Sequence, residues 1–225
     1  MDMKGIAHPY ISVSGHGRLT YGGSQRDARD PAMQKWGCGV IAATDLLLYL
    51  QRTRPGCRLP VIAPRTGAVP FDLYRQAAAR LRRGFFPLIP GFGLNAFVLA
   101  FGLNRLFRRG RIPLRAAWGC RRREMWDRIG SMLDQDLPVI LCVGRGWPGR
   151  RLSFYIRNGE NGLVRASRVS GHYVTITGMS ERWLRISSWG RELYIDRREL
   201  ETYIRSASGS FLTNIVSLRP VDRKS

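Results

Sequence analysis

The chain has 225 residues and a formal net charge of +21, which comes from 37 lysines and arginines against 16 aspartates and glutamates. Its four cysteines are too few for a disulfide scaffold, and none stands in a Cys-x-x-Cys or Cys-x-x-His pair. This composition argues against a disulfide-rich secreted protein and against a zinc site. We therefore expect free thiols, a cytoplasmic location and no metal or other cofactor. No internal repeat or low-complexity linker divides the chain, so we expect a single domain over residues 1–225.

No stretch of the chain combines the length and apolarity of a signal peptide or a membrane span. Residues 1–10 contain no apolar run of the kind that a signal peptide requires. The most apolar segment, residues 84–103, is interrupted by Pro87, Pro90 and Gly91. We expect a loop followed by a buried helix in that segment, and no integral membrane segment in the chain.

Arginine supplies nearly all of the basic charge. Between Asp72 and Glu124 the chain contains no acidic residue and twelve arginines: Arg75, Arg80, Arg82, Arg83, Arg105, Arg108, Arg109, Arg111, Arg115, Arg121, Arg122 and Arg123. Such a charge attracts anions, so one expectation is an anionic partner, whether an acidic peptide, nucleic acid or an anionic membrane. The alternative is a solvated basic face, because charge alone identifies no partner.

The first half of the chain is predicted to be mainly helical after an irregular start. Residues 1–35 are rich in Gly, Ser and Asp, and the N-terminal segment 1–24 is expected to be irregular. The apolar run from Cys38 to Leu50 predicts a helix. Apolar residues that recur near the 3.6-residue period predict three more helices, over residues 71–83, 94–107 and 123–133.

Short apolar or alternating runs in the second half predict strands. The predicted strands span residues 137–143, 153–155, 172–177, 183–188, 193–195 and 211–218, with a short helix over residues 198–204. Helices come first and antiparallel strands follow. This order predicts an α+β fold in which a helical half packs against an antiparallel β-sheet.

Cys38 stands in the sequence Trp36-Gly37-Cys38-Gly39-Val40, at the start of the first predicted helix. The free backbone N–H groups and the positive end of the helix dipole at such a position favour a thiolate, which is a nucleophile. The alternative is a buried structural cysteine, because free cysteines are among the most buried residues. A base elsewhere in the chain would favour the interpretation of Cys38 as a nucleophile over that of a structural cysteine.

The chain has only three histidines from which that base could come. His8 and His16 lie in the N-terminal segment, whereas His172 opens a predicted strand and would be held at the edge of a sheet. The next strand ends in Ser187-Ser188-Trp189-Gly190. Two adjacent antiparallel strands would bring a polar residue of this sequence to Nδ1 of His172, where it would fix the tautomer while the tryptophan excludes water.

These motifs resemble those of the papain-like cysteine peptidases. A Cys-Gly pair heads an apolar helix, and Gly171-His-Tyr-Val174 and Ser188-Trp-Gly190 follow in the same order as in that family. Pro138-Val139 is similar to the family's strand ahead of the histidine. The closest likeness is to the bacterial bacteriocin-processing peptidases, which cut after a double glycine, and it extends over roughly residues 25–204.

The resemblance implies a papain-like fold and assigns roles to particular residues. Cys38 would be the nucleophile and His172 the general base. The family's orienting asparagine or aspartate falls on Ser187. This is a departure from the family's pattern, because a hydroxyl orients an imidazole but adds no negative charge to stabilise the imidazolium.

Acyl transfer also needs donors for the developing oxyanion. The backbone N–H of Cys38 would supply one donor, and Gln25 and Gln34 are the candidates for the second. The family places its glutamine six residues before the cysteine, where this chain has Ala32. We favour Gln25, because the Tyr-Gly-Gly-Ser sequence of residues 21–24 can form a tight turn that aims its side chain.

The leading hypothesis from the sequence is a thiol hydrolase that cleaves a peptide or amide bond of a peptide or protein substrate through a cysteine acyl-enzyme. A transferase, in which an amine replaces water, has the same sequence signature. The alternative is a catalytically silent papain-like protein that binds an anionic partner through its arginine-rich face. Residues 85–107 and their flanking arginines would be the contact with an anionic membrane.

Overall fold

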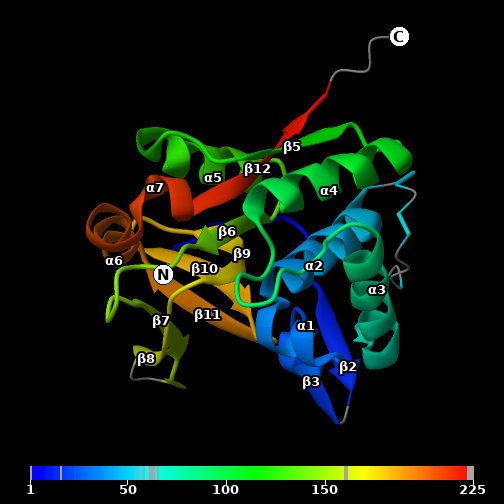
Figure 1. Cartoon of the computed structure of the whole chain (residues 1–225), viewed down its shortest axis with the longest axis horizontal. Coiled ribbons are helices and arrows are strands. Elements are labelled where there is room, and N and C mark those ends of the chain that lie inside the picture. The colour runs from blue at the N-terminus through cyan, green and yellow to red at the C-terminus, as the bar shows by residue number, and fades with distance from the viewer. Residues whose placement is uncertain are drawn as a thin grey trace.

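The structure is a computed structural model of the chain, and it describes residues 2–15, 17–54, 56–57, 59–60, 64, 66–159 and 162–221. His16 lies outside the described residues. Figure 1 shows four helices on one side of the molecule and most of the strands on the other. These helices are α1 (Pro31–Trp36), α2 (Cys38–Thr53), α3 (Phe71–Gly84) and α4 (Ala96–Arg109). The α+β class predicted from the sequence is therefore confirmed.

The helices include some, such as α1 and α4, that begin with a side-chain cap and others, such as α2 and α3, that begin without one. They are η1 (Gln25–Asp27), α1 (Pro31–Trp36), α2 (Cys38–Thr53), α3 (Phe71–Gly84), α4 (Ala96–Arg109), η2 (Arg122–Glu124), α5 (Met125–Asp134), α6 (Arg197–Tyr203), the π-helical turn Ile204–Ser208 and α7 (Gly209–Leu212). The side chain of Asn95 caps α4 by accepting from the backbone N–H of Phe97 at 2.8 Å. Asp30 caps α1 in the same way through Ala32, and Pro31 suits its first turn.

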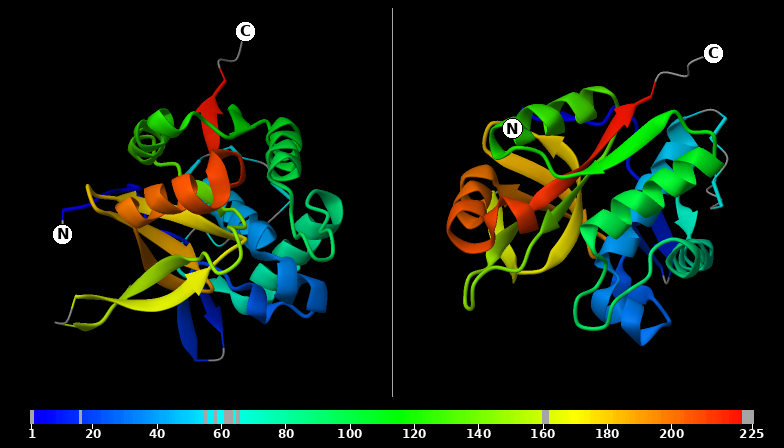
Figure 2. Two further views of the ribbon diagram at one scale, coloured as in Figure 1. Left: turned by 60° about the vertical axis from the view of Figure 1, so that its left-hand side comes forward. Right: turned by 45° about the horizontal axis from the view of Figure 1, so that its top comes forward.

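The main sheet is antiparallel throughout. Its strands are β1 (Lys4–Gly5), β5 (Leu114–Trp118), β6 (Val139–Val143), β7 (Leu152–Arg157), β8 (Leu163–Val169), β9 (His172–Met179), β10 (Trp183–Ser188), β11 (Arg191–Asp196) and β12 (Asn214–Pro220). Their order is β5-β12-β6-β9-β10-β11-β7-β8, and β1 pairs with the far end of β9. Figure 2 shows β12 and β5 side by side at one edge of this sheet.

The N-terminal segment is not irregular, which corrects the expectation for residues 1–24. It contains β1 and the hairpin of β2 (Ser12–Gly15) and β3 (Arg18–Tyr21), and β2 also pairs with β4 (Val69–Pro70) in a small second sheet. These strands are two to four residues long, and β4 lies more than fifty residues further along the chain. Such short strands carry little local signal, because their stability comes from distant partners.

Helix α2 forms the centre of the core. Every residue from Gly39 to Leu50 is buried, which is typical of a helix enclosed on all sides. It packs against β9 and β6 of the sheet and against α3 and α4 of the helical half. The helix that begins at Cys38 is therefore the element that joins the two halves.

Among the helices that the structure describes, none has the length and apolarity needed to cross a bilayer. Helix α4 has an apolar face that includes Leu99, Leu103 and Leu106, all fully buried. The segment that the sequence marks as most apolar is thus a loop followed by a core helix, as predicted.

Candidate active site

Cys38 is the first residue of α2, as the sequence predicts. The turn that leads into the helix is tight, because the N–H of Gly37 donates to the carbonyl oxygen of Met33 at 2.8 Å. A Cβ on Gly37 would lie only 2.3 Å from that oxygen, and a Cβ on Gly39 would lie 3.1 Å from the ring of Tyr173. Glycines on both sides of Cys38 therefore allow the surrounding backbone and the Tyr173 ring to approach closely.

His172 is the first residue of β9 and is only 8% exposed. Its side chain and that of Cys38 line one small hollow where the start of α2 meets β9 and β10. The hollow is also lined by Gln25, Asp45, Ser187, Ser188 and Trp189. The structure thus gathers the predicted nucleophile, base, orienting serines and glutamine at one place.

The imidazole is held by Ser188 and not by Ser187. Nε2 of His172 lies 2.8 Å from Oγ of Ser188, whereas Oγ of Ser187 donates to the carbonyl oxygen of Tyr21 at 2.9 Å. Ser187 pairs with Thr175 across the strands, so the residue after it shares a face with His172. The expected contact between Ser187 and Nδ1 is therefore replaced by one between Ser188 and Nε2.

Trp189 covers the histidine, as the sequence suggests. The two rings are stacked, with centroids 4.5 Å apart and an angle of 24° between their planes. Trp189 has a φ of 51°, a left-handed backbone conformation that costs a bulky residue on the order of 1 kcal/mol. The guanidinium of Arg26 lies over the same indole at 5.6 Å. With this backbone conformation the indole of Trp189 lies on the imidazole of His172 and shields the imidazole from water.

Burial keeps the Cys38 thiol and the His172 imidazole uncharged at neutral pH. It raises the pKa of the Cys38 thiol, and the nearby backbone N–H groups of Tyr173 and Gly39 offset this only in part. Burial, followed by the charge of Arg26, lowers the pKa of His172 to about 4. The resting pair at neutral pH is thus a thiol and an uncharged imidazole, not the thiolate expected from the helix start. An uncharged imidazole is the form that accepts a proton.

Of the two candidate glutamines, Gln25 is the one that lines the hollow. Its Nε2 donates to the backbone oxygen of Gln34 at 2.7 Å, while the amide of Gln34 turns away to the carbonyl oxygen of Ala28. Ser24 caps the short helix that starts at Gln25 by accepting from the N–H of Arg26. Gln25 therefore lies at the hollow, with its amide nitrogen bound to the backbone of Gln34.

The turn that carries Gln25 is clamped from two sides. Gly22 has a φ of +73°, and a Cβ there would lie 2.3 Å from Oγ of Ser187 and 2.4 Å from Oδ2 of Asp45. Two backbone bonds join the turn to Gly190, from the N–H of Tyr21 at 2.9 Å and to the carbonyl oxygen of Gly23 at 2.9 Å. Only glycine fits this approach, so the turn is tied to both the helical half and the sheet.

Asp45 is a residue of this site that the sequence analysis did not single out. It is buried two turns along α2 from Cys38, and its carboxylate accepts from Tyr74 at 2.6 Å, from Tyr10 at 3.1 Å and from the N–H of Gly23 at 3.1 Å. Burial raises its pKa to about 6. A single acid within the apolar run of residues 40–50 was the available signal, because buried carboxylates require such partners.

Within the described residues, no group of three His, Cys, Asp or Glu side chains is placed to hold a metal ion. All four cysteines, each within the described ranges, are free. Cys142 and Cys57 also have a raised pKa caused by burial. Among the cysteines, Cys38 alone stands both at a helix start and in the hollow with His172.

No protein-family model matches the chain, and no curated protein matches it. Among solved structures, a chain from Bacillus anthracis that is provisionally described as a C39-like peptidase is similar, with a TM-score of 0.47 and 11% sequence identity. The match covers 83% of this chain and 90% of that one. At this identity and TM-score the similarity carries no residue roles.

Asp45→Asn should change how stability depends on pH. The pKa of Asp45 is raised from 3.8 to about 6 in the folded protein, so the folded state binds the proton more tightly than the unfolded state. The stabilisation from the protonated carboxyl is complete below pH ~4 and is lost as the pH rises through ~6. Urea unfolding between these pH values should show the stability of the native protein declining relative to that of Asp45→Asn, by an amount on the order of 2 kcal/mol.

His172 has a lowered pKa and changes stability in the opposite direction over this range, so the comparison must be made between the two proteins and not on one alone. Parallel stability curves for the native protein and Asp45→Asn would show that the carboxyl does not titrate in this range.

Proposed function

We propose that the chain is a thiol hydrolase of the papain-like kind that cleaves a peptide or amide bond through an acyl-enzyme on Cys38. The observation that supports this most is that Cys38, at the start of α2, and His172, at the start of β9, line the same hollow. A second support is the contact between the imidazole and Ser188 at 2.8 Å. Nucleophile, base and orienting group are the three parts of this chemistry.

In the proposed reaction, Sγ of Cys38 attacks the substrate carbonyl carbon while its proton passes to Nδ1 of His172. Nε2–H of the imidazole donates to Ser188 and keeps the lone pair on Nδ1. The backbone N–H of Cys38 and the amide of Gln25 stabilise the oxyanion. The imidazolium then protonates the leaving amine as the carbon–nitrogen bond breaks, which leaves a thioester.

Water completes the proposed reaction. His172 takes a proton from the water as its oxygen attacks the thioester carbon, and Cys38 leaves and recovers its proton. An amine in place of water would make the enzyme a transferase. The likeness to the bacteriocin-processing group makes peptides that contain a double glycine the first substrates to test.

Two features of the site support a second candidate, a catalytically silent protein with an anionic partner. The raised pKa of Cys38 disfavours the thiolate, and a serine stands where a charged orienting group would stabilise an imidazolium. The excess of arginine would then be the functional feature. The two candidates differ in whether Cys38 performs chemistry.

Cys38→Ala should abolish cleavage of a peptide library, read by mass spectrometry as newly formed termini, because it removes the nucleophile. His172→Ala should lower cleavage at least about a hundredfold, since it removes the base. Cys120→Ala is the matched control, because Cys120 is a half-buried free thiol that does not line the hollow. Cleavage that survives in Cys38→Ala would contradict the proposal, and a folded native protein that cleaves nothing would favour the silent candidate.

Ser188→Ala should lower kcat/KM by about two- to tenfold on the peptide that is cleaved fastest, because one hydrogen bond to the imidazole is lost. Ser187→Ala is the neighbouring control, since its hydroxyl binds Tyr21 and not His172. Ser187→Ala should leave the acidic limb of the pH profile of kcat/KM unchanged, whereas Ser188→Ala should shift that limb. Equal effects of the two substitutions would exclude Ser188 as the orienting residue.

Gln25→Ala should lower kcat by about a hundredfold with little effect on KM, because an oxyanion donor acts mainly in the transition state. Gln34→Ala provides the comparison, because the side chain of Gln34 donates to Ala28 and does not line the hollow. A loss in Gln34→Ala that matches the loss in Gln25→Ala would assign the effect to the packing of this segment.

A further inference from the structure

A second and larger hollow lies next to the one that contains Cys38. It has a volume of about 600 Å³ and is lined by residues of α1 and α3, by Ile41 of α2 and by the residues on either side of η1. Ile41, one turn into α2, lines both hollows, and the consecutive residues Ser24 and Gln25 line one each. The larger hollow, here called the arginine groove, is therefore separated from the proposed reacting groups by one short segment of chain.

The floor of the arginine groove is apolar. Met33 of α1, Ile41 of α2 and Ala78 of α3 line it, and each is less than a tenth exposed. Tyr74 also reaches it, but its hydroxyl is used by Asp45. A floor of this kind accommodates an apolar side chain and offers no exposed aromatic ring on which a nucleotide base could stack.

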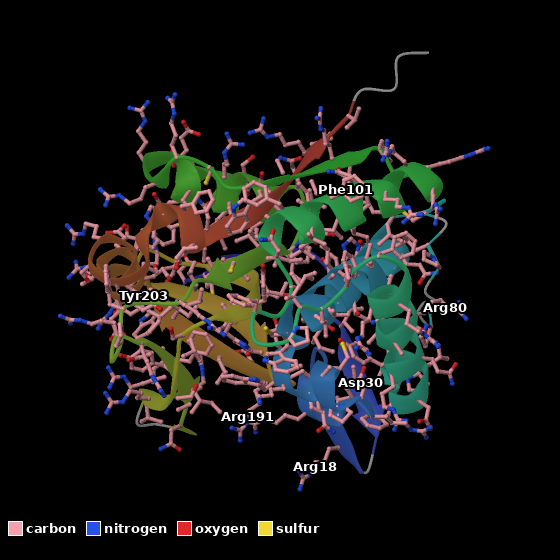
Figure 3. All side chains as sticks on the ribbon, in the orientation of Figure 1. Arg18, Asp30, Arg80, Phe101, Arg191 and Tyr203 are labelled. Atoms are coloured by element: carbon pink, nitrogen blue, oxygen red, sulfur yellow. The ribbon has the colours of Figure 1, made fainter. Side chains whose placement is uncertain are left out.

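The rim of the arginine groove is strongly basic. It has five arginines, Arg29, Arg75, Arg80, Arg82 and Arg83, and only two acidic residues, Asp30 and Asp72. Figure 3 labels Asp30, the N-cap of α1, and Arg80 of α3, which both line the groove. Five positive and two negative charges leave an excess of +3 at the rim.

The acidic residues of the rim already have partners. Asp30 forms an ion pair with Arg82 across the groove, and Asp72 lies 3.7 Å from Arg75. Arg80 donates to the carbonyl oxygen of Pro60 at 3.2 Å, which leaves its charge uncompensated. Within the described residues, Arg29 and Arg83 have no acidic partner. Both are exposed, so both can bind an anion that enters the groove.

We propose that the arginine groove binds an acidic segment of the peptide substrate. An apolar side chain of that segment would occupy the floor, and its carboxylates would pair with Arg29 and Arg83. Charge complementarity favours an anionic ligand, and the apolar floor without an exposed aromatic ring favours a peptide over nucleic acid. The concave shape disfavours a membrane surface. The claim that this peptide is a substrate rests on the proposed function. The claim that the groove binds it does not.

The test measures binding without catalysis. Cys38→Ala protein is titrated into a short fluorescein-labelled peptide in which glutamates flank one leucine, and fluorescence anisotropy is read at low and at raised ionic strength. Arg29→Glu with Arg83→Glu should weaken binding at least about fivefold, because two attractions become repulsions. Thermal unfolding checks that the variants fold, and the exposure of both arginines predicts that they do.

The control has the same change in charge at another place. Arg121→Glu with Arg123→Glu alters two exposed arginines at η2, which do not line the groove, and should change affinity by less than about twofold. Equal weakening by the two double variants would mean that only net charge attracts the peptide and would overturn the proposal. Unchanged binding in the groove variant would also overturn it.

Two further ligands make the result specific. A peptide with lysines in place of glutamates should not bind. A single-stranded RNA that binds more tightly than the acidic peptide and loses affinity in the groove variant would overturn the assignment to a peptide. Loss of peptide binding in the groove variant supports the proposed binding site even if the native protein cleaves nothing. The binding proposal and the proposed hydrolase function can therefore fail separately.

Discussion

The burial of α2 on every side is the constraint on which the rest of the structure depends. The helix lies between the sheet, through β9 and β6, and the helical half, through α3 and α4, and all of its residues from Gly39 to Leu50 are buried. It cannot move without opening the core on both sides. Its first residue, Cys38, is therefore held in place against the start of β9, where His172 stands.

The same burial determines the electrostatics of the site. Removal from water raises the pKa of Cys38 and Asp45 and lowers that of His172. Asp45 is compensated by the hydroxyl groups of Tyr10 and Tyr74, whereas His172 contacts one hydroxyl group, that of Ser188. The uncharged thiol and imidazole that result suit general-base attack on a carbonyl, in which the proton moves as the bond forms.

Two glycines allow the N-terminal segment to pack closely against α2 and its neighbours. Gly22 and Gly23 pass between Asp45, Tyr74 and Ser187 with no room for a side chain, and the turn they form carries Gln25 to the hollow. This explains why the segment is structured although its sequence is rich in glycine and serine. Its order comes from contacts with α2, α3 and the turn after β10, not from its own strand propensity.

The sequence by itself determined the helix that begins at Cys38, the strand that begins at His172 and the α+β class, because apolar periodicity and glycine punctuation are local signals. Only the tertiary structure decided between Ser187 and Ser188, because the pairing of β10 with β9 sets which serine shares a face with the histidine. It also decided the ionisation of Cys38. The helix start favours a thiolate, but the loss of water on burial outweighs it, and that loss depends on residues far away in the chain.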